Sequence, residues 1–426
     1  MTQAIRTQLA IVGGGPAGMM LGLLMARAGI NVVVLEKHGD FLRDFRGDTV
    51  HPSTLEVMYE LGLLEDFLKR PHQKLRELSG VIGGVDVKIA DFTHVPAHCR
   101  FIALMPQWDF LDFLAGHAKR YPNFHLMMET EATNLIEDGG RVTGVVAEGP
   151  EGGLELRADL VVACDGRHSL MREQARLPLF EFGVPIDVMW MKLSKSSVDS
   201  PTTLGRIGAG AIFVTLDRGD YWQCAFVIAK GGADSLRAQG LEAFRQSIVK
   251  VAPPFADRVT ELQDWDQIKL LRVKVNRLRE WCRPGLLCIG DAAHAMSPVG
   301  GIGINLAIQD AVATANILAP VLARGLPTLD DLKRIQQRRA FPTRMTQKLQ
   351  MAVQNKIMTR MLALTENPKP PCAVKLLNRF PILRRLPARV VGMGFRPQHV
   401  RSPVAVNQSR PHLLPLSSVD PPTNKA

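Results

Sequence analysis

Apolar runs and glycine-rich breaks alternate at the start of the chain. Residues 9–12 form a short apolar run that ends at three consecutive glycines, Gly13 to Gly15, and residues 17–28 have a helical composition. Gly29 then interrupts the pattern, and a β-branched run over 31–35 ends at Glu36. Strand, glycine turn, helix and strand at this spacing predict one βαβ unit of a parallel sheet.

The rest of the pattern divides the chain into helical and strand-rich segments. Helical periodicity extends over 53–69, 108–120, 236–251, 310–322 and 329–364. Strand-like alternation dominates 75–100, 126–162 and the remainder of 182–271. This interleaving predicts a discontinuous nucleotide-binding domain (1–74, 101–180 and 275–330) with a β-rich domain (75–100 and 181–274) inserted twice. A C-terminal helix (331–365) and a basic, proline-rich segment (366–426) complete the chain.

The first glycine turn has the spacing of a dinucleotide-binding fingerprint, Gly13-x-Gly15-x-x-Gly18. These glycines allow a tight turn, close approach of the backbone to a pyrophosphate, and close packing of the helix on the strand. Glu36 ends the second strand, where its carboxylate is placed to accept hydrogen bonds from a ribose. We count the neighbouring Ala17 and Lys37 among the predicted cofactor contacts. The fingerprint alone does not distinguish NAD from FAD.

Two later motifs each follow an apolar strand. Asp165-Gly166 precedes Ser169 and Arg172 at the start of a predicted helix, although Asp-Gly alone is more typical of an ordinary turn. Gly290-Asp291 follows the strand at 286–289, and its carboxylate is suited to accept bonds from a polyol.

A glycine-rich turn at 298–305 then opens another helix, whose N-terminus would favour negative charge on a bound ring. The predicted contacts of this turn are Pro298, Gly300, Gly301, Gly303, Ile304 and Asn305. His294 has two interpretations, a catalytic base or a structural histidine bonded to backbone, and the second is favoured.

The three motifs, in this order and spacing, resemble those of the group A flavoprotein monooxygenases, which include para-hydroxybenzoate hydroxylase and the ubiquinone-biosynthesis hydroxylases. The resemblance implies an α/β fold with a Rossmann-like FAD-binding domain, an inserted β-sheet-rich substrate domain and a helical C-terminal extension. It also implies two further FAD contacts, Arg46 and Gln107. Cys164 and Ile302 depart from the residues common in the family, but neither removes a backbone contact.

The same resemblance implies a reaction. NADPH or NADH would reduce FAD transiently, O2 would form a C4a-hydroperoxyflavin, and an aromatic or quinone-precursor-like small molecule would be hydroxylated. Residues 188–191 and 221–223 are candidates for an apolar lid over the ring, with ordinary sheet core as an equal alternative. Other functions remain open: a halogenase, a prenyl-type reductase, or a non-catalytic, membrane-associated assembly protein that retains FAD. The Trp-x-Trp-x-Ile-Pro signature of tryptophan-type halogenases is missing.

The excess of positive charge lies in the C-terminal part of the chain. Residues 333–426 contain 18 Lys and Arg against two acidic residues, whereas residues 1–332 contain 34 basic and 39 acidic residues. A mildly acidic body argues against a nucleic-acid substrate. The mixture of apolar and basic residues at 374–387 fits either peripheral contact with a membrane or, preferentially, a solvated basic face. Without a secretory signal or a CxxC pair, we expect a cytoplasmic protein, which the basic segment would place at the inner membrane face, and no metal site.

Overall fold

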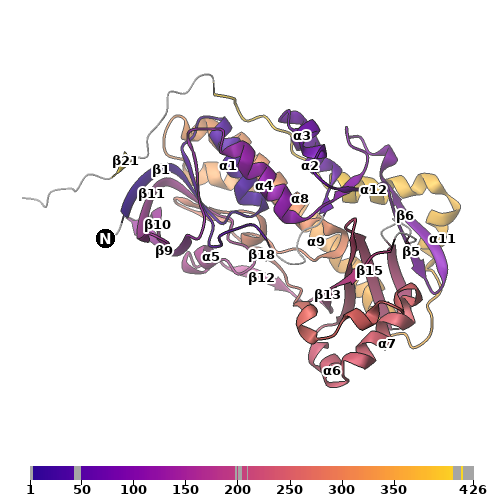
Figure 1. The fold of residues 1–426 in the computed structure, drawn as a ribbon. Coiled ribbons are helices and arrows are strands. Elements are labelled where there is room, and N and C mark those ends of the chain that lie inside the picture. Colours follow the sequence, from indigo (N-terminus) through magenta and orange to yellow (C-terminus); the bar gives the residue numbers. More distant parts are fainter. Residues whose placement is uncertain are drawn as a thin grey trace, which may run out of the picture.

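A mostly parallel sheet forms the centre of the larger part of the molecule (Figure 1). The computed structural model describes residues 3–42, 49–196, 199, 204–208, 210–405 and 414–415. The strand order is β19 (Cys282–Arg283), β20 (Leu286–Cys288), β11 (Gly152–Ala163), β1 (Gln3–Val12), β2 (Val32–Leu35) and β8 (Phe124–Met127). All four residues of β2 are buried, as expected for a parallel strand covered on both faces.

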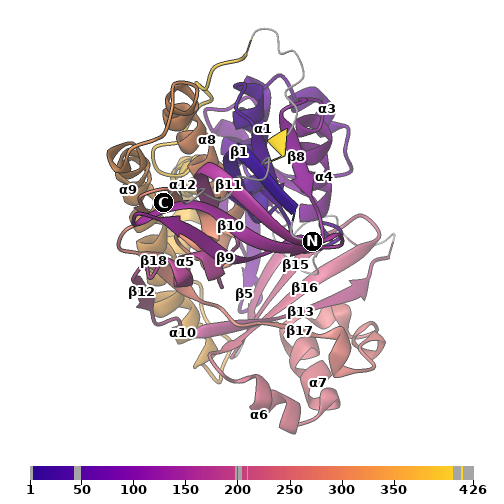
Figure 2. The same ribbon diagram turned by 90° about the vertical axis from the view of Figure 1, so that its left-hand side faces the viewer.

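Long helices cover this sheet, and an antiparallel ribbon extends it. Helix α1 (Pro16–Arg27) packs against α4 (Gln107–Ala118) and against α8 (Gly303–Leu322). On the edge of β11 that faces away from β1, β10 (Arg141–Gly149) and β9 (Glu131–Asp138) continue the sheet as an antiparallel ribbon, visible in Figure 2. The segment Val299–Leu322 is long and apolar enough to cross a membrane, but 78% of its most apolar window is buried, which identifies it as a core helix.

Segments far apart in the sequence build a second, seven-stranded sheet. Its order is β17 (Lys269–Leu271), β13 (Ile186–Ser194), β16 (Tyr221–Ala229), β15 (Ala211–Asp217), β14 (Leu204–Gly208), β5 (Glu77–Ile82) and β6 (Val85–Asp91). The parallel pairing of β14 with β5 joins the two segments. Helix α7 (Leu241–Val251) covers one face of this sheet. The predicted fold class is therefore confirmed, whereas the limits of the individual domains stay a prediction.

Two predicted helices are each divided by a glycine. The helix expected over 53–69 is α2 (Pro52–Glu60) and α3 (Leu64–Leu68), separated at Gly62, which has φ of +71°. The helix expected over 236–251 is α6 (Ala233–Ala238) and α7, separated at Gly240, which has φ of +89°. Gly62 follows α2 and Gly240 is the N-cap of α7, and both have a positive φ that favours glycine, so apolar periodicity alone overestimated the length of each helix.

The predicted C-terminal helix bends but continues. Helix α9 (Leu329–Val353) passes through one π-helical turn, η7 (Gln354–Met358), into α10 (Thr359–Leu362). After it, α11 (Cys372–Arg379), the 3₁₀ turn η8 (Pro381–Arg384) and α12 (Arg385–Met393) follow one another along the edge strand β6. The extension therefore touches both parts of the molecule: α9 packs on α8, and α11 and α12 pack on β6.

Candidate functional site

Four parallel strands end at the same edge of the larger sheet. Val12 at the end of β1 lies opposite Leu35 of β2 and Ala163 of β11, and Ala163 lies opposite Cys288 of β20. The residues that follow these strands include Gly13, Glu36, Asp165 and Gly290, so the three motifs, separated by more than a hundred residues each, come together. In open α/β sheets, ligands bind outside the carboxyl ends of the strands.

In the first glycine turn, Gly13 and Gly18 are tightly packed against other backbone atoms, whereas Gly15 borders open space. Gly13 has φ of +102°, and a Cβ there would be 2.5 Å from the carbonyl oxygen of Cys164. A Cβ on Gly18 would be 2.0 Å from the carbonyl oxygen of Gly13. At Gly15, by contrast, a Cβ meets no described atom within 4 Å. Gly15 is the N-cap of α1, whose first backbone N–H groups lack intrahelical partners.

Glu36 is a buried carboxylate attached to this turn. Its two oxygens accept hydrogen bonds from the backbone N–H of Gly14 (2.9 Å) and of His38 (3.1 Å). A carboxylate at the end of the second strand of such a unit is suited to accept hydrogen bonds from ribose hydroxyls. The predicted contact Lys37 points elsewhere, because its Nζ pairs with Oε1 of Glu131 at 3.5 Å among exposed side chains. Its contact with a cofactor stays a prediction.

The second motif is organised around a short helix, α5 (Leu170–Gln174). Ser169 caps it by accepting a hydrogen bond from the N–H of Arg172 (3.0 Å). One carboxylate oxygen of Asp165 accepts from the N–H of Met171 (3.1 Å), while the other is buried and has no hydrogen-bond partner among the described residues. Burial raises the pKa of Asp165. A buried, unpartnered acceptor at the strand edge suits a ligand hydroxyl.

Arg172 connects the second motif to the third. Its guanidinium donates to the carbonyl oxygens of Ala292 (3.0 Å) and Arg167 (3.1 Å). The structure thus gives this side chain a bracing role, and its direct contact with a cofactor stays a prediction. Arg167 Nη2 lies 4.0 Å from Oδ2 of Asp291, whose side chain is 36% exposed and remains accessible.

A buried ion network supports the third motif. His294 Nε2 bonds Oδ2 of Asp310 (2.6 Å), and Arg339 Nε donates to Oδ1 of the same carboxylate (2.7 Å). The N–H of Gly290 also donates to Oδ2 of Asp310 (3.1 Å). Burial opposes the charge of Asp310, but His294 and Arg339 outweigh it and lower the pKa of the carboxyl group.

His294 is therefore a structural histidine, as favoured from the sequence, but its partner is a carboxylate rather than the predicted backbone. No motif in the sequence indicated Arg339, which lies 29 residues from Asp310 and reaches it by the packing of α9 on α8.

The glycine turn before α8 is fastened to the short strand β3 (Thr49–Val50) and to His51. Gly300 and Gly301 have φ of +79° and +62°, and a Cβ on Gly301 would be 2.2 Å from Oγ1 of Thr49. Asn305 is buried, and its Oδ1 accepts from the N–H of His51 (2.8 Å) while its Nδ2 donates to the carbonyl oxygen of Thr49 (3.1 Å). The side chain of Asn305 is occupied by protein, so only its backbone is available to a cofactor.

We expect Asn305→Asp to loosen this turn. The substitution replaces an amide donor by an oxygen facing the carbonyl oxygens of Thr49 and Gly301, and an unpaired buried polar group costs about 1–3 kcal/mol. Urea unfolding should show the loss, together with weaker FAD retention during gel filtration. Asn316→Asp, at an exposed amide that also donates to a carbonyl, is the control. Equal effects of the two substitutions would contradict the assignment.

Two glutamines hold the start of the same turn. Gln350 Nε2 donates to the carbonyl oxygens of Ser297 (2.9 Å) and Val299 (2.8 Å), and Gln354 Nε2 donates to Oγ of Ser297 (2.6 Å). Gln347 is buried one turn earlier on the same face. The sequence analysis did not identify them, although polar residues recurring at 347, 350 and 354 are a detectable signal of a buried polar face.

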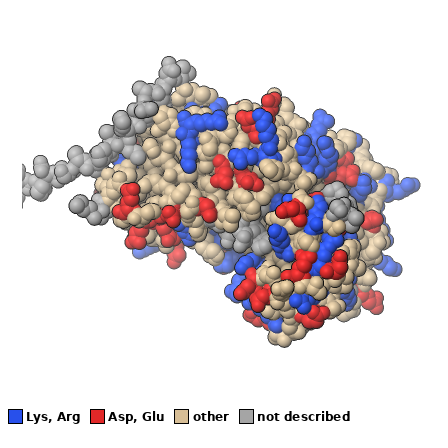
Figure 3. Space-filling model, viewed as in Figure 1, with Lys and Arg blue, Asp and Glu red and all other residues tan. Residues whose placement is uncertain are grey.

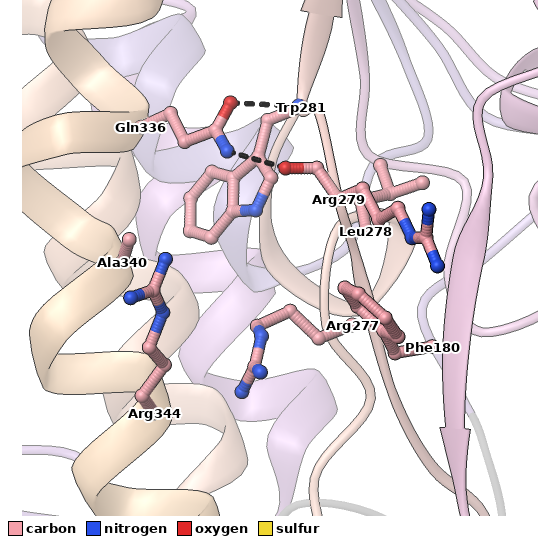
Figure 4. Close-up of a pocket in the computed structure, with 8 residues that line it drawn as sticks. All are labelled: Phe180, Arg277, Leu278, Arg279, Trp281, Gln336, Ala340 and Arg344. Carbon is pink, nitrogen blue, oxygen red and sulfur yellow. Dashed lines mark hydrogen bonds between the residues drawn. The ribbon is translucent and has the colours of Figure 1, made fainter.

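A basic hollow of about 220 Å³ lies between α9 and β18 (Val275–Leu278), as Figure 4 shows. It is lined by Phe180, Arg277, Leu278, Arg279, Trp281, Gln336, Ala340 and Arg344. Gln336 joins helix to strand by accepting from the N–H of Trp281 (2.9 Å) and donating to the carbonyl oxygen of Arg279 (2.7 Å). None of its lining residues belongs to the three motifs, so this hollow is separate from the candidate site.

An apolar face of the second sheet is packed by α10 and by Val299 of the glycine turn. Val188, Ile212 and Val227 are buried in one cluster, and Trp190 and Val299 pack against it. Because side chains alternate along β13, Met189 and Met191 lie on the other face, beneath α7. Trp222 is buried in that same core. Residues 188–191, which were predicted as part of an apolar lid, are thus divided between the two faces of the second sheet.

Comparisons with known proteins decide what this arrangement is. A family model described as "FAD binding domain" matches residues 6–348. The 6-methylpretetramide 4-monooxygenase of Streptomyces rimosus is 32% identical over 403 residues, covering 93% of this chain and 94% of the relative. The chain belongs to the group A flavoprotein monooxygenase family.

Two further matches agree with this assignment. The para-nitrophenol 4-monooxygenase of Pseudomonas sp. strain WBC-3 is 27% identical, covering 78% of this chain and 82% of the relative. The solved structure of a probable FAD-dependent monooxygenase from Pseudomonas aeruginosa has a TM-score of 0.72 at 21% identity, covering 84% of this monooxygenase and 98% of that chain. That likeness shows the fold. The predicted family, enzyme class and cofactor are therefore confirmed.

The strand edge suits FAD. The open space beside Gly15 and the N-terminus of α1 fit a pyrophosphate, and Glu36 fits a ribose. Asp291 and the unpartnered oxygen of Asp165 fit hydroxyl groups, and the N-terminus of α8 fits the flavin ring. Gln107 is the first residue of α4, and its contact with FAD stays a prediction. Arg46 lies outside the described residues.

Proposed function

We propose that this monooxygenase hydroxylates a phenolic substrate, with NADH or NADPH as electron donor and O2 as the source of the added oxygen. The observation that carries the proposal is the position of the glycine turn 298–303. It lies between the strand edge that suits FAD and the apolar face of the second sheet, to which Val299 itself belongs. A substrate on that face would be next to the flavin ring.

The residues of the chain have separable tasks in this reaction. When bound, FAD accepts a hydride from the nicotinamide donor and activates O2. The first N–H groups of α8 stabilise negative charge on the reduced ring, because a helix N-terminus carries a partial positive charge. The apolar face containing Val188, Ile212 and Val227 would exclude water from the ring of a bound flavin.

The names of the relatives support an aromatic substrate. The relative matched over almost the whole chain acts on 6-methylpretetramide, and another acts on para-nitrophenol. Activity on an aromatic compound is the common feature that we transfer to this protein. We extend the proposal to both a single-ring phenol and a larger aromatic compound as candidates for the first assays.

The expected result is NAD(P)H oxidation that depends on substrate. Purified protein carrying FAD should oxidise NADH or NADPH slowly alone and faster with the right member of a panel of phenols, 6-methylpretetramide and quinone precursors. With oxygen-18 gas, mass spectrometry should find one labelled oxygen in the product. Rapid oxidation indifferent to every compound, with no label incorporated, would contradict hydroxylation. A product that requires halide would instead indicate a halogenase.

A further inference from the structure

Large apolar side chains are exposed on the C-terminal extension. Leu376 of α11 is 50% exposed, Phe380 51%, Ile382 of η8 64% and Leu386 of α12 69%. They lie within eleven consecutive residues, on elements that contact one another. Single exposed apolar residues are ordinary on protein surfaces, but such a concentration marks a surface that contacts something.

The opposite side of these elements is firmly attached to the body. Asn378 Oδ1 accepts from the N–H of Lys88 (2.8 Å), and its Nδ2 donates to the carbonyl oxygen of Asp86 (3.0 Å), both in β6. Arg384 Nε donates to the carbonyl oxygen of Leu377 (2.9 Å), which holds η8 against α11. Ala388 is fully buried against the body. The apolar side chains are therefore held facing outward by packing on their other side.

Positive charge surrounds these apolar residues without any acidic counterpart in the sequence. The exposed cations are Lys369, Lys375, Arg379, Arg385 and Arg389. No Asp or Glu occurs from residue 367 to residue 405. Figure 3 shows Lys and Arg side chains projecting from the edge of the molecule where α11 and α12 lie. We call residues 369–389 the basic apolar cap.

We propose that the basic apolar cap binds the surface of a membrane containing anionic lipids. An interfacial segment of this kind combines apolar side chains that enter the lipid with cations that contact the headgroups. A merely solvated basic face would explain the cations but not Phe380, Ile382 and Leu386. A second copy of the chain on this surface would bring two sets of unpaired cations together, which is unfavourable.

The proposal is tested with the FAD-loaded protein and sedimentation of lipid vesicles. Vesicles of phosphatidylcholine alone are compared with vesicles that also contain phosphatidylglycerol, at low and high salt. The apolar variant combines Phe380→Ser, Ile382→Ser and Leu386→Ser. Its control, Leu326→Ser with Val404→Ser, removes leucine and valine side chains that are 58% and 57% exposed elsewhere.

A second variant tests the charges. Lys375→Gln, Arg379→Gln and Arg389→Gln remove three cations of the cap, and Lys119→Gln, Arg120→Gln and Lys333→Gln remove three exposed cations elsewhere. We expect about fivefold weaker binding to anionic vesicles per cation removed from the cap. Both cap variants should keep the flavin absorbance spectrum and melting temperature of the native protein.

The expected pattern is binding to anionic vesicles that weakens with salt, falls in both cap variants and persists in both controls. Native protein that stays in the supernatant with anionic vesicles would overturn the proposal. So would equal binding by cap and control variants. If light scattering shows a dimer that the apolar variant converts to a monomer, and vesicles are not bound, the cap is covered by a second copy and the proposal is wrong.

Discussion

Replacing Gly15 by alanine is expected to remove FAD from the protein while leaving its fold intact. Gly15 has an ordinary backbone conformation, with φ of −71°, and a Cβ there meets no described atom within 4 Å. Alanine therefore fits the protein alone, and the change in the free energy of unfolding without FAD should stay within about 0.5 kcal/mol. The added methyl group occupies the space through which the backbone approaches a pyrophosphate.

Gly13→Ala is the matched substitution, because it should damage the fold as well. The left-handed backbone and the 2.5 Å approach to the carbonyl oxygen of Cys164 each cost roughly 1–3 kcal/mol. Melting of the FAD-free proteins separates the two effects, and titration with FAD measures affinity. We expect at least a tenfold loss of FAD affinity for Gly15→Ala, about 1.4 kcal/mol. Native affinity in Gly15→Ala would show that the cofactor lies elsewhere.

Breaking the buried ion network should produce the largest loss of stability. His294, Asp310 and Arg339 are all at most 1% exposed, so removal of one partner leaves uncompensated charge in the core. Arg339→Met and Asp310→Asn are each expected to lower the free energy of unfolding by about 3–5 kcal/mol. Asp310→Asn should also weaken FAD binding, because Asp310 holds the N–H of Gly290 in the third motif.

A double-mutant cycle identifies the pair as the cause. The double variant should lose less than the sum of the single losses, with a coupling of about 0.5–3 kcal/mol, since it leaves neither charge alone. Lys69→Met, which breaks the exposed pair with Asp66 at 2.8 Å, should leave the melting temperature nearly unchanged. Additive losses in the cycle would mean that each residue acts through packing rather than through the ion pair.

The basic hollow and the glutamine face show how the C-terminal helix serves the site without entering it. Arg277 Nη1 donates to Oε1 of Gln347 (2.8 Å), whose Nε2 donates to the carbonyl oxygens of Asn276 (2.7 Å) and Ala295 (3.2 Å). These bonds connect α9 to β18 and to Ala295, which precedes the glycine turn 298–303 in the chain. The extension is thus part of the framework that sets the position of residues 297–303.

The sequence by itself determined the family and the cofactor, and it predicted the edge of the sheet at which that cofactor binds. Local chemistry was sufficient for this prediction. Gly13 has a backbone conformation that only glycine adopts easily, and Glu36 stands at the end of a strand, so both positions can be recognised from short stretches of sequence. Parallel strands then bring their carboxyl ends to one edge whatever the intervening chain does. The helix ends at Gly62 and Gly240 are local features of the same kind, so the sequence could have predicted them, but the apolar periodicity predicted one continuous helix at each place.

Only the tertiary structure decided which side chains support the site and which are free to act. Arg339 reaches Asp310 of α8, and Gln350 and Gln354 reach the start of the glycine turn, because α9 packs on α8. Tertiary packing also placed the side chain of Asn305 in hydrogen bonds with Thr49 and His51. It also divided the apolar stretch 188–191 between two clusters on opposite faces of the second sheet, because alternate residues of a strand point to opposite faces.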